Sequence, residues 1–70
     1  MKEIYASMAG TVLNLLVEKE EQITKGQQVI ILESMKMEIP IESSIEGAVN
    51  EIKVEIGDFV NEGDVLIVLG

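Results

Sequence analysis

Residues 10–18 read GTVLNLLVE, and the pattern returns at residues 47–55 as GAVNEIKVE. Shifting the chain by 37 positions pairs residues 10–33 with residues 47–70 and gives seven identities in 24 pairs. Random pairing at this composition gives about two identities, which indicates an internal duplication. In both copies the apolar positions are spaced by three and then by two, as in Val12, Leu15 and Val17. A regular strand keeps a spacing of two, so we expect a β-bulge in each copy.

These bulges are predicted near Leu13-Asn14 and near Asn50-Glu51. Apolar runs of strand length alternate with turn residues, and no segment keeps a helical period of 3.6. We therefore expect one all-β domain over residues 1–70, a flattened β-barrel or sandwich of two four-stranded halves related by a pseudo-twofold axis. The expected strands are residues 2–7, 10–18, 22–24, 28–33, 37–41, 48–56, 59–60 and 65–69.

Pro40 and Glu20 lead to predictions about local backbone structure. Pro40 has no N–H to donate, so the strand at residues 37–41 should be an edge strand or turn that position outward. Glu20 occupies the position that Gly57 holds in the second copy. If this turn requires a left-handed residue, Glu20 costs on the order of 1 kcal/mol.

The composition excludes several kinds of site. The chain has no Cys and no His, which rules out disulfides, thiolate or imidazole metal sites and His-based catalytic triads. Thirteen acidic and five basic residues give a net charge of −8, which disfavours nucleic acid and anionic membrane surfaces as partners. No long apolar run or signal region is present, so we expect a soluble, cytoplasmic protein.

The seam between the two copies reads ESMKME at residues 33–38 and places Lys36 between two methionines. A lysine amine titrates near 10.4, about three units above neutral pH, so a nucleophilic lysine needs burial or cationic neighbours. Lys36 has Glu33 and Glu38 nearby instead, and no cationic residue within ten positions. We therefore expect a passive amine that another enzyme modifies. By symmetry it should lie at the end of the molecule furthest from the chain termini.

The two methionines have two interpretations. If strand alternation continues through the seam, Met35 and Met37 face opposite to Lys36, and at least one of them should cap the end of the core. Alternatively, the two flexible thioethers form a docking surface. The residues alone leave this choice open.

Met35-Lys36-Met37, with Glu33 and Ser34 before it and Glu38 and Pro40 after it, resembles the biotin-attachment motif of biotin carboxyl carrier domains. The resemblance extends over nearly the whole chain and is strongest to short, free-standing biotin/lipoyl attachment proteins. It implies a barrel-sandwich hybrid fold that carries biotin covalently on Lys36. Glu33, Ser34, Met35 and Met37 would then be the motif that the modifying enzyme recognises. Ser34 departs from many carriers, which have Ala there.

The resemblance further implies that a biotin protein ligase loads Lys36. The biotin would then accept carboxylate at a biotin carboxylase and deliver it at a carboxyltransferase, while the chain itself, expected to be a monomer, performs no catalysis.

Three alternatives remain. A lipoyl carrier would load lipoate on the same Lys36, although lipoyl domains usually place Asp before the lysine and a small residue after it. A transporter or membrane-fusion adaptor would use the fold only as a scaffold and needs no lysine between methionines. A stand-alone enzyme would have only carboxylates as acids and bases, and no paired, buried carboxylates are evident.

Overall fold

The computed structural model describes residues 2–70, which form eight short strands and no helix. The strands form two antiparallel four-stranded sheets, with the orders β1-β8-β6-β3 and β5-β4-β2-β7. The described residues include no helix of the length and apolar character that a membrane span requires. The strands are β1 (Lys2–Tyr5), β2 (Gly10–Leu15), β3 (Gln22–Ile23), β4 (Gln28–Ser34), β5 (Met37–Glu42), β6 (Gly47–Ile52), β7 (Phe59–Val60) and β8 (Val65–Leu69).

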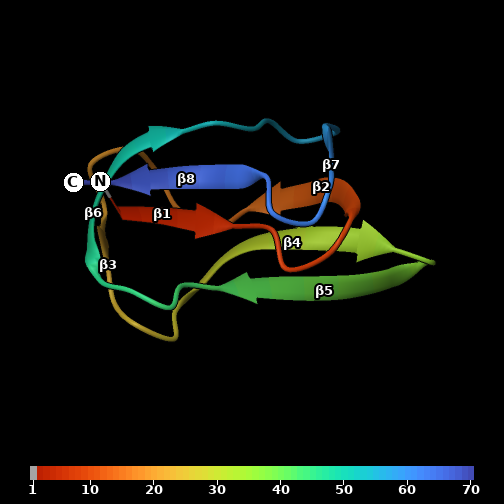
Figure 1. The fold of residues 1–70 in the computed structure, drawn as a ribbon, viewed down its shortest axis with the longest axis horizontal. Coiled ribbons are helices and arrows are strands. Elements are labelled where there is room, and N and C mark those ends of the chain that lie inside the picture. Colours follow the sequence, from red (N-terminus) through yellow and green to blue (C-terminus); the bar gives the residue numbers. More distant parts are fainter. Residues whose placement is uncertain (1) are drawn as a thin grey trace.

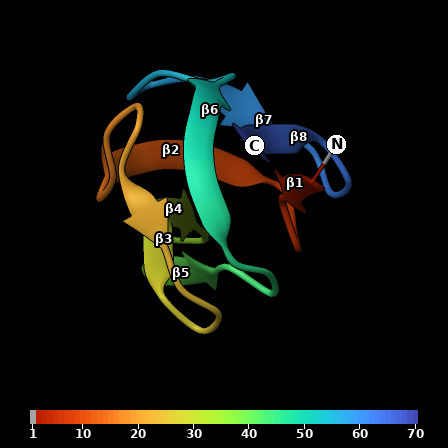
Figure 2. The same ribbon diagram turned by 90° about the vertical axis from the view of Figure 1, so that its left-hand side faces the viewer.

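The two sheets confirm the duplication and show how the copies are combined. Each sheet takes two strands from the first half of the chain and two from the second. The shift of 37 positions converts one sheet into the other, since it carries β1, β2, β3 and β4 onto β5, β6, β7 and β8. Figures 1 and 2 show the sheets wrapped around one interior. The expected all-β sandwich of two four-stranded halves is therefore correct, with strands exchanged between the halves.

Both predicted bulges are present. The register between β2 and β4 shifts between Val12 and Asn14, and the register between β6 and β8 shifts between Val49 and Glu51. Each shift leaves one extra residue, Leu13 or Asn50, in the long central strand. A bulge bends the strand and increases its twist, and this allows each small sheet to curve around the core.

Pro40 lies on β5, which is an edge strand of its sheet, as expected from its missing N–H.

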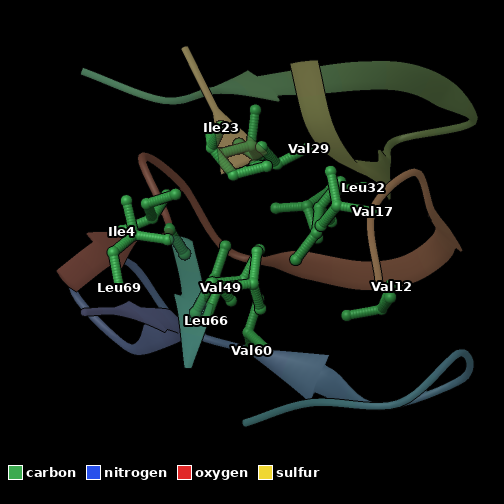
Figure 3. Close-up of a cluster of buried hydrophobic side chains, with 14 residues drawn as sticks. Ile4, Val12, Val17, Ile23, Val29, Leu32, Val49, Val60, Leu66 and Leu69 are labelled. Carbon is green, nitrogen blue, oxygen red and sulfur yellow. The ribbon is translucent and has the colours of Figure 1, made fainter. Parts of the chain in front are cut away.

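The core is aliphatic and follows the twofold repeat (Figure 3). Its buried side chains are almost all Ile, Leu and Val, and aromatic residues are absent from it within the described part of the chain. Most of them form symmetry-related pairs, which are Ile4/Ile41, Val12/Val49, Ile23/Val60, Val29/Leu66, Ile30/Ile67 and Leu32/Leu69. A chain of this size buries only a modest share of its surface, so this dense packing carries most of the stability.

The turns of each half bond to the central strand of the other half. The Glu20 N–H donates to the Val49 carbonyl oxygen at 2.8 Å, and the Gly57 N–H donates to the Val12 carbonyl oxygen at 2.8 Å. Glu20 has φ 76° and Gly57 has φ 98°, so the two turns share a left-handed residue. The predicted strain at Glu20 is therefore present, because glutamate takes up a conformation that favours glycine.

Two other glycines allow a close backbone approach. A Cβ at Gly10 would lie 2.8 Å from the Glu33 carbonyl oxygen, and a Cβ at Gly47 would lie 3.1 Å from the Gly70 carbonyl oxygen. These are equivalent contacts in the two copies. The first lies where β2 crosses β4, close to the end of β4 that leads into Lys36.

Glu20→Gly should stabilise the protein by about 0.5 kcal/mol. The substitution removes a left-handed strain of about 1–2 kcal/mol and increases the entropy of the unfolded chain at a cost of about 0.5–1 kcal/mol. Urea denaturation measures the change. Gly57→Glu is the matched control and should destabilise, because it places a side chain on a residue with φ 98°. Its Cβ would meet no atom within 4 Å, so only the backbone conformation is affected. A loss of stability in Glu20→Gly would contradict the assignment of strain.

Gly10→Ala should destabilise by about 1–3 kcal/mol, because the new Cβ meets a backbone oxygen that cannot move without separating β2 from β4. Thermal unfolding followed by circular dichroism measures the loss. Gly70→Ala is the control, since Gly70, like Gly10, has no positive φ, and its Cβ would lie at an ordinary contact distance of 3.8 Å from Asn50 Cβ. Equal losses in the two variants would show that contact with Glu33 is not the cause.

Candidate modification site

Lys36 lies in the two-residue turn that joins β4 to β5. Ser34 pairs with Met37, so Met35 and Lys36 alone form the connection, with φ values of 53° and 65°. Positive φ at both central residues defines the type I′ turn, whose twist matches that of a hairpin. Asn-Gly is the usual sequence there, whereas Met-Lys costs about 1–2 kcal/mol per residue. Pairing from Gln28 to Ser34 along β4 stabilises the hairpin against this strain.

The turn stands at the far end of the molecule. The molecule measures 32 × 19 × 18 Å, and Figure 1 shows the β4–β5 turn at one end of the long axis. The start of β1 and the end of β8 lie at the opposite end (Figure 1). This is the arrangement that the repeat predicted. A partner can therefore approach Lys36 without meeting whatever is joined to the chain ends.

The methionines do not cap the core, so that expectation was wrong. Met35 is 90% exposed and Met37 is 59% exposed, and Lys36 between them is exposed as well. The expectation failed because the type I′ turn ends the strand alternation at Ser34. Met35 and Lys36 instead lie beyond the last pair of the ladder, and Met37 belongs to that pair. Two apolar thioethers held in solvent beside an amine form a contact surface.

The other predicted site residues lie directly below the turn. Glu33 pairs with Glu38 across the hairpin, both are exposed, and Ser34 is partly buried between Glu33 and the turn. Like charges at directly opposite positions are mildly destabilising. Within residues 2–70 the single ion pair joins Lys53 to Glu51 at 3.4 Å, so Lys36 is not tied to either glutamate. The hairpin thus places the Lys36 ammonium group at its tip, with the carboxylates of Glu33 and Glu38 one step further from the tip.

The same row of the sheet includes residues that the motif did not indicate. Thr11 of β2 pairs with Glu33 on one side and with Phe59 of β7 on the other. Phe59 is an exposed aromatic residue, whereas its counterpart in the first copy is Gln22. A comparison of the two copies, position by position, would have identified it.

The described residues offer no enclosed site at this end. They form no pocket, and no group of three or more Asp or Glu side chains is arranged to hold a metal ion. What the hairpin does offer is a primary amine at an exposed, sharply defined tip. An exposed amine of this kind fits a covalently attached group, since acylation needs only access to Nζ and space beyond it.

Comparison with known proteins agrees with this geometry. A family model described as "Biotin-requiring enzyme", the biotin/lipoyl family, matches residues 2–69. The chain is 58% identical over 62 residues to the Biotin/lipoyl attachment protein of Bacillus subtilis, covering 89% of this chain and 85% of that protein. It is 42% identical over 64 residues to the Biotin carboxyl carrier protein of Streptococcus mutans, covering 91% of this chain and 49% of that protein.

The fold also matches a solved structure. The Kluyveromyces lactis urea carboxylase superposes with a TM-score of 0.90 and 28% identity, over 99% of this chain and 6% of that chain. The agreement covers both sheets, so the duplicated sandwich and its hairpin are those of a carrier domain associated with biotin-dependent carboxylases. The chain is a member of the biotin/lipoyl attachment family, whose domains carry a covalently bound group and are not themselves catalytic.

Proposed function

We propose that this chain is a biotin carrier, loaded on Lys36 by a biotin protein ligase, that moves carboxylate from a biotin carboxylase to a carboxyltransferase. The observation that carries the proposal is the exposed Met35-Lys36-Met37 tip, held by a type I′ turn at the far end from the chain termini. The name of the Streptococcus mutans relative supports attachment of biotin in particular, whereas the name of the Bacillus subtilis relative covers biotin and lipoate alike.

The role of the chain in this function is to present the attached group to its partners. Loading forms an amide between Lys36 Nζ and the biotin carboxyl carbon, while Nζ loses a proton and the activating group leaves with its bonding electrons. Once attached, biotin supplies a ureido nitrogen that can take up and release a carboxyl group. The β4–β5 turn keeps Lys36 clear of the sheets, and Met35 and Met37 provide apolar contact on either side. Tethering raises the effective concentration of the carried group at each partner.

The mass of the chain isolated from its source tests which group is carried. We expect the mass increase of one biotinyl amide, located on Lys36 by fragmentation. A lipoyl adduct would overturn the proposal and support a lipoyl carrier, which the family also contains.

Lys36→Arg should abolish labelling by avidin after expression with a biotin ligase, since the guanidinium keeps the charge but is not acylated. The free energy of unfolding should remain within about 0.5 kcal/mol of the original, because the side chain is exposed and forms no ion pair within residues 2–70. Lys25→Arg, on the exposed turn at residues 24–27, is the matched control and should label normally. Labelling that persists in Lys36→Arg would refute the attachment site.

Met35→Leu and Met37→Leu should leave the fold intact, because both side chains are exposed and Leu is of similar volume. We expect slower biotin loading or slower carboxyl transfer, since Leu lacks the flexible, polarisable thioether. Initial rates of both reactions measure the effect, with thermal unfolding as the check on the fold. Unchanged rates in both assays would show that the methionines have no recognition role.

A further inference from the structure

The duplication allows each exposed residue to be compared with its counterpart in the other copy. The turns at residues 18–21 and 55–58 have the same structure, since the Glu18 N–H donates to Glu21 Oε1 at 3.0 Å and the Glu55 N–H donates to Asp58 Oδ2 at 2.9 Å. Equivalent positions in the two copies therefore meet the same demands of folding. Where exposed residues differ in kind between the copies, folding does not explain the difference.

Within the described residues, five exposed apolar or aromatic side chains differ in this way, and three of them lie on adjoining segments. Leu13, Ile56 and Phe59 are 39%, 62% and 65% exposed. Their counterparts are polar, and they are Asn50, Lys19 and Gln22 respectively. We call Leu13, Ile56 and Phe59 the apolar patch. Since the other copy folds with a polar residue at each equivalent position, the patch is not required by the fold.

The patch lies on adjoining segments. Phe59 pairs with Thr11, and the Val12 N–H donates to the Asp58 carbonyl oxygen at 2.8 Å. These bonds place the segment from Ile56 to Phe59 alongside the start of β2, where Leu13 is the extra residue of the bulge. Figure 1 shows β7 on the side of the molecule towards the β4–β5 turn, whereas β3, its counterpart, lies at the other end.

The patch is within reach of a protein that holds Lys36. Phe59, Thr11 and Glu33 occupy neighbouring strands, so Phe59 lies about 10 Å from Glu33 at a strand spacing near 4.8 Å. Glu33 is two residues before the turn, which adds about 7 Å along the strand. The acidic pair Glu33 and Glu38 separates the patch from the tip. A partner surface that covers the patch, the acidic pair and the tip needs an apolar area beside a basic one.

We propose that the apolar patch docks the ligase that acylates Lys36, through an apolar surface flanked by basic side chains. The inference rests on the proposed function and names a partner for the same site. Partners that use the loaded chain can bind the carried biotin itself, but the ligase must recognise the chain before biotin is present. Surface contacts are then its source of affinity, and the net charge of −8 complements a basic rim.

The test replaces two of the three patch residues with their counterparts from the other copy. In the double variant Ile56→Lys and Phe59→Gln, folding should be retained, because Lys19 and Gln22 are accepted at the equivalent positions. With a biotin protein ligase and the purified chain as the varied substrate, KM should rise about tenfold or more while kcat changes little, as expected when apolar contact area is lost.

Leu16→Lys is the matched control. Leu16 is also exposed, its counterpart is Lys53, and it lies five residues further along the chain from Thr11, beyond the end of β2. Its KM should equal that of the original chain. A tenfold rise in the control as well would overturn the inference, since the effect would then come from added charge and not from the patch.

Other outcomes are equally decisive. If the double variant is loaded normally but fails in carboxyl transfer, the patch serves a carboxylase partner and the assignment to the ligase is wrong. If sedimentation shows that the original chain dimerises and the double variant does not, the patch is a self-association surface and the inference is again wrong. If the original chain itself is not loaded, the proposed function fails, which is distinct from an unchanged KM in the variant.

Discussion

The exchange of strands between the two halves is the constraint on which the structure depends. β1 and β3 of the first half complete a sheet with β8 and β6, and β5 and β7 do the same with β4 and β2. Each half alone pairs only two strands, β2 with β4 or β6 with β8, so neither half has a four-stranded sheet or a closed core of its own. The crossed turn bonds hold the two halves together, whereas the close approaches at Gly10 and Gly47 each lie within one half. The consequence is a rigid body of small size without disulfides or metal ions among the described residues.

This rigidity is what allows an unfavourable turn at the tip. Met35 and Lys36 both adopt a left-handed conformation that their side chains disfavour. A glycine in this turn would relieve the strain, but it could not carry an acyl group. Strained backbone at a functional position persists only where the surrounding structure fixes it, and here the β4–β5 ladder does so.

The sequence predicted the architecture well because the duplication shows each structural pattern twice, once in each copy. The bulges at Leu13 and Asn50 were visible as the same phase slip in two places, and the strain at Glu20 was visible by comparison with Gly57. The methionines were misplaced because a Met-Lys pair carries no turn signal, so strand alternation was extended one step too far. Local periodicity does not show where a ladder stops when the turn is formed by atypical residues.

The ladder between β1 and β8 repeats the ladder between β4 and β5, including its irregularity. Lys2 pairs with Leu69 as Ile39 pairs with Leu32, and the register shifts after Ile4 as it does before Ile30. The paired strands β4 and β5 are joined by the turn that contains Lys36, whereas the equivalent pair β8 and β1 is not joined by the chain. A circular permutant that is joined from β8 to β1 and cut at the hairpin would keep every strand pair while moving the chain ends to the opposite pole.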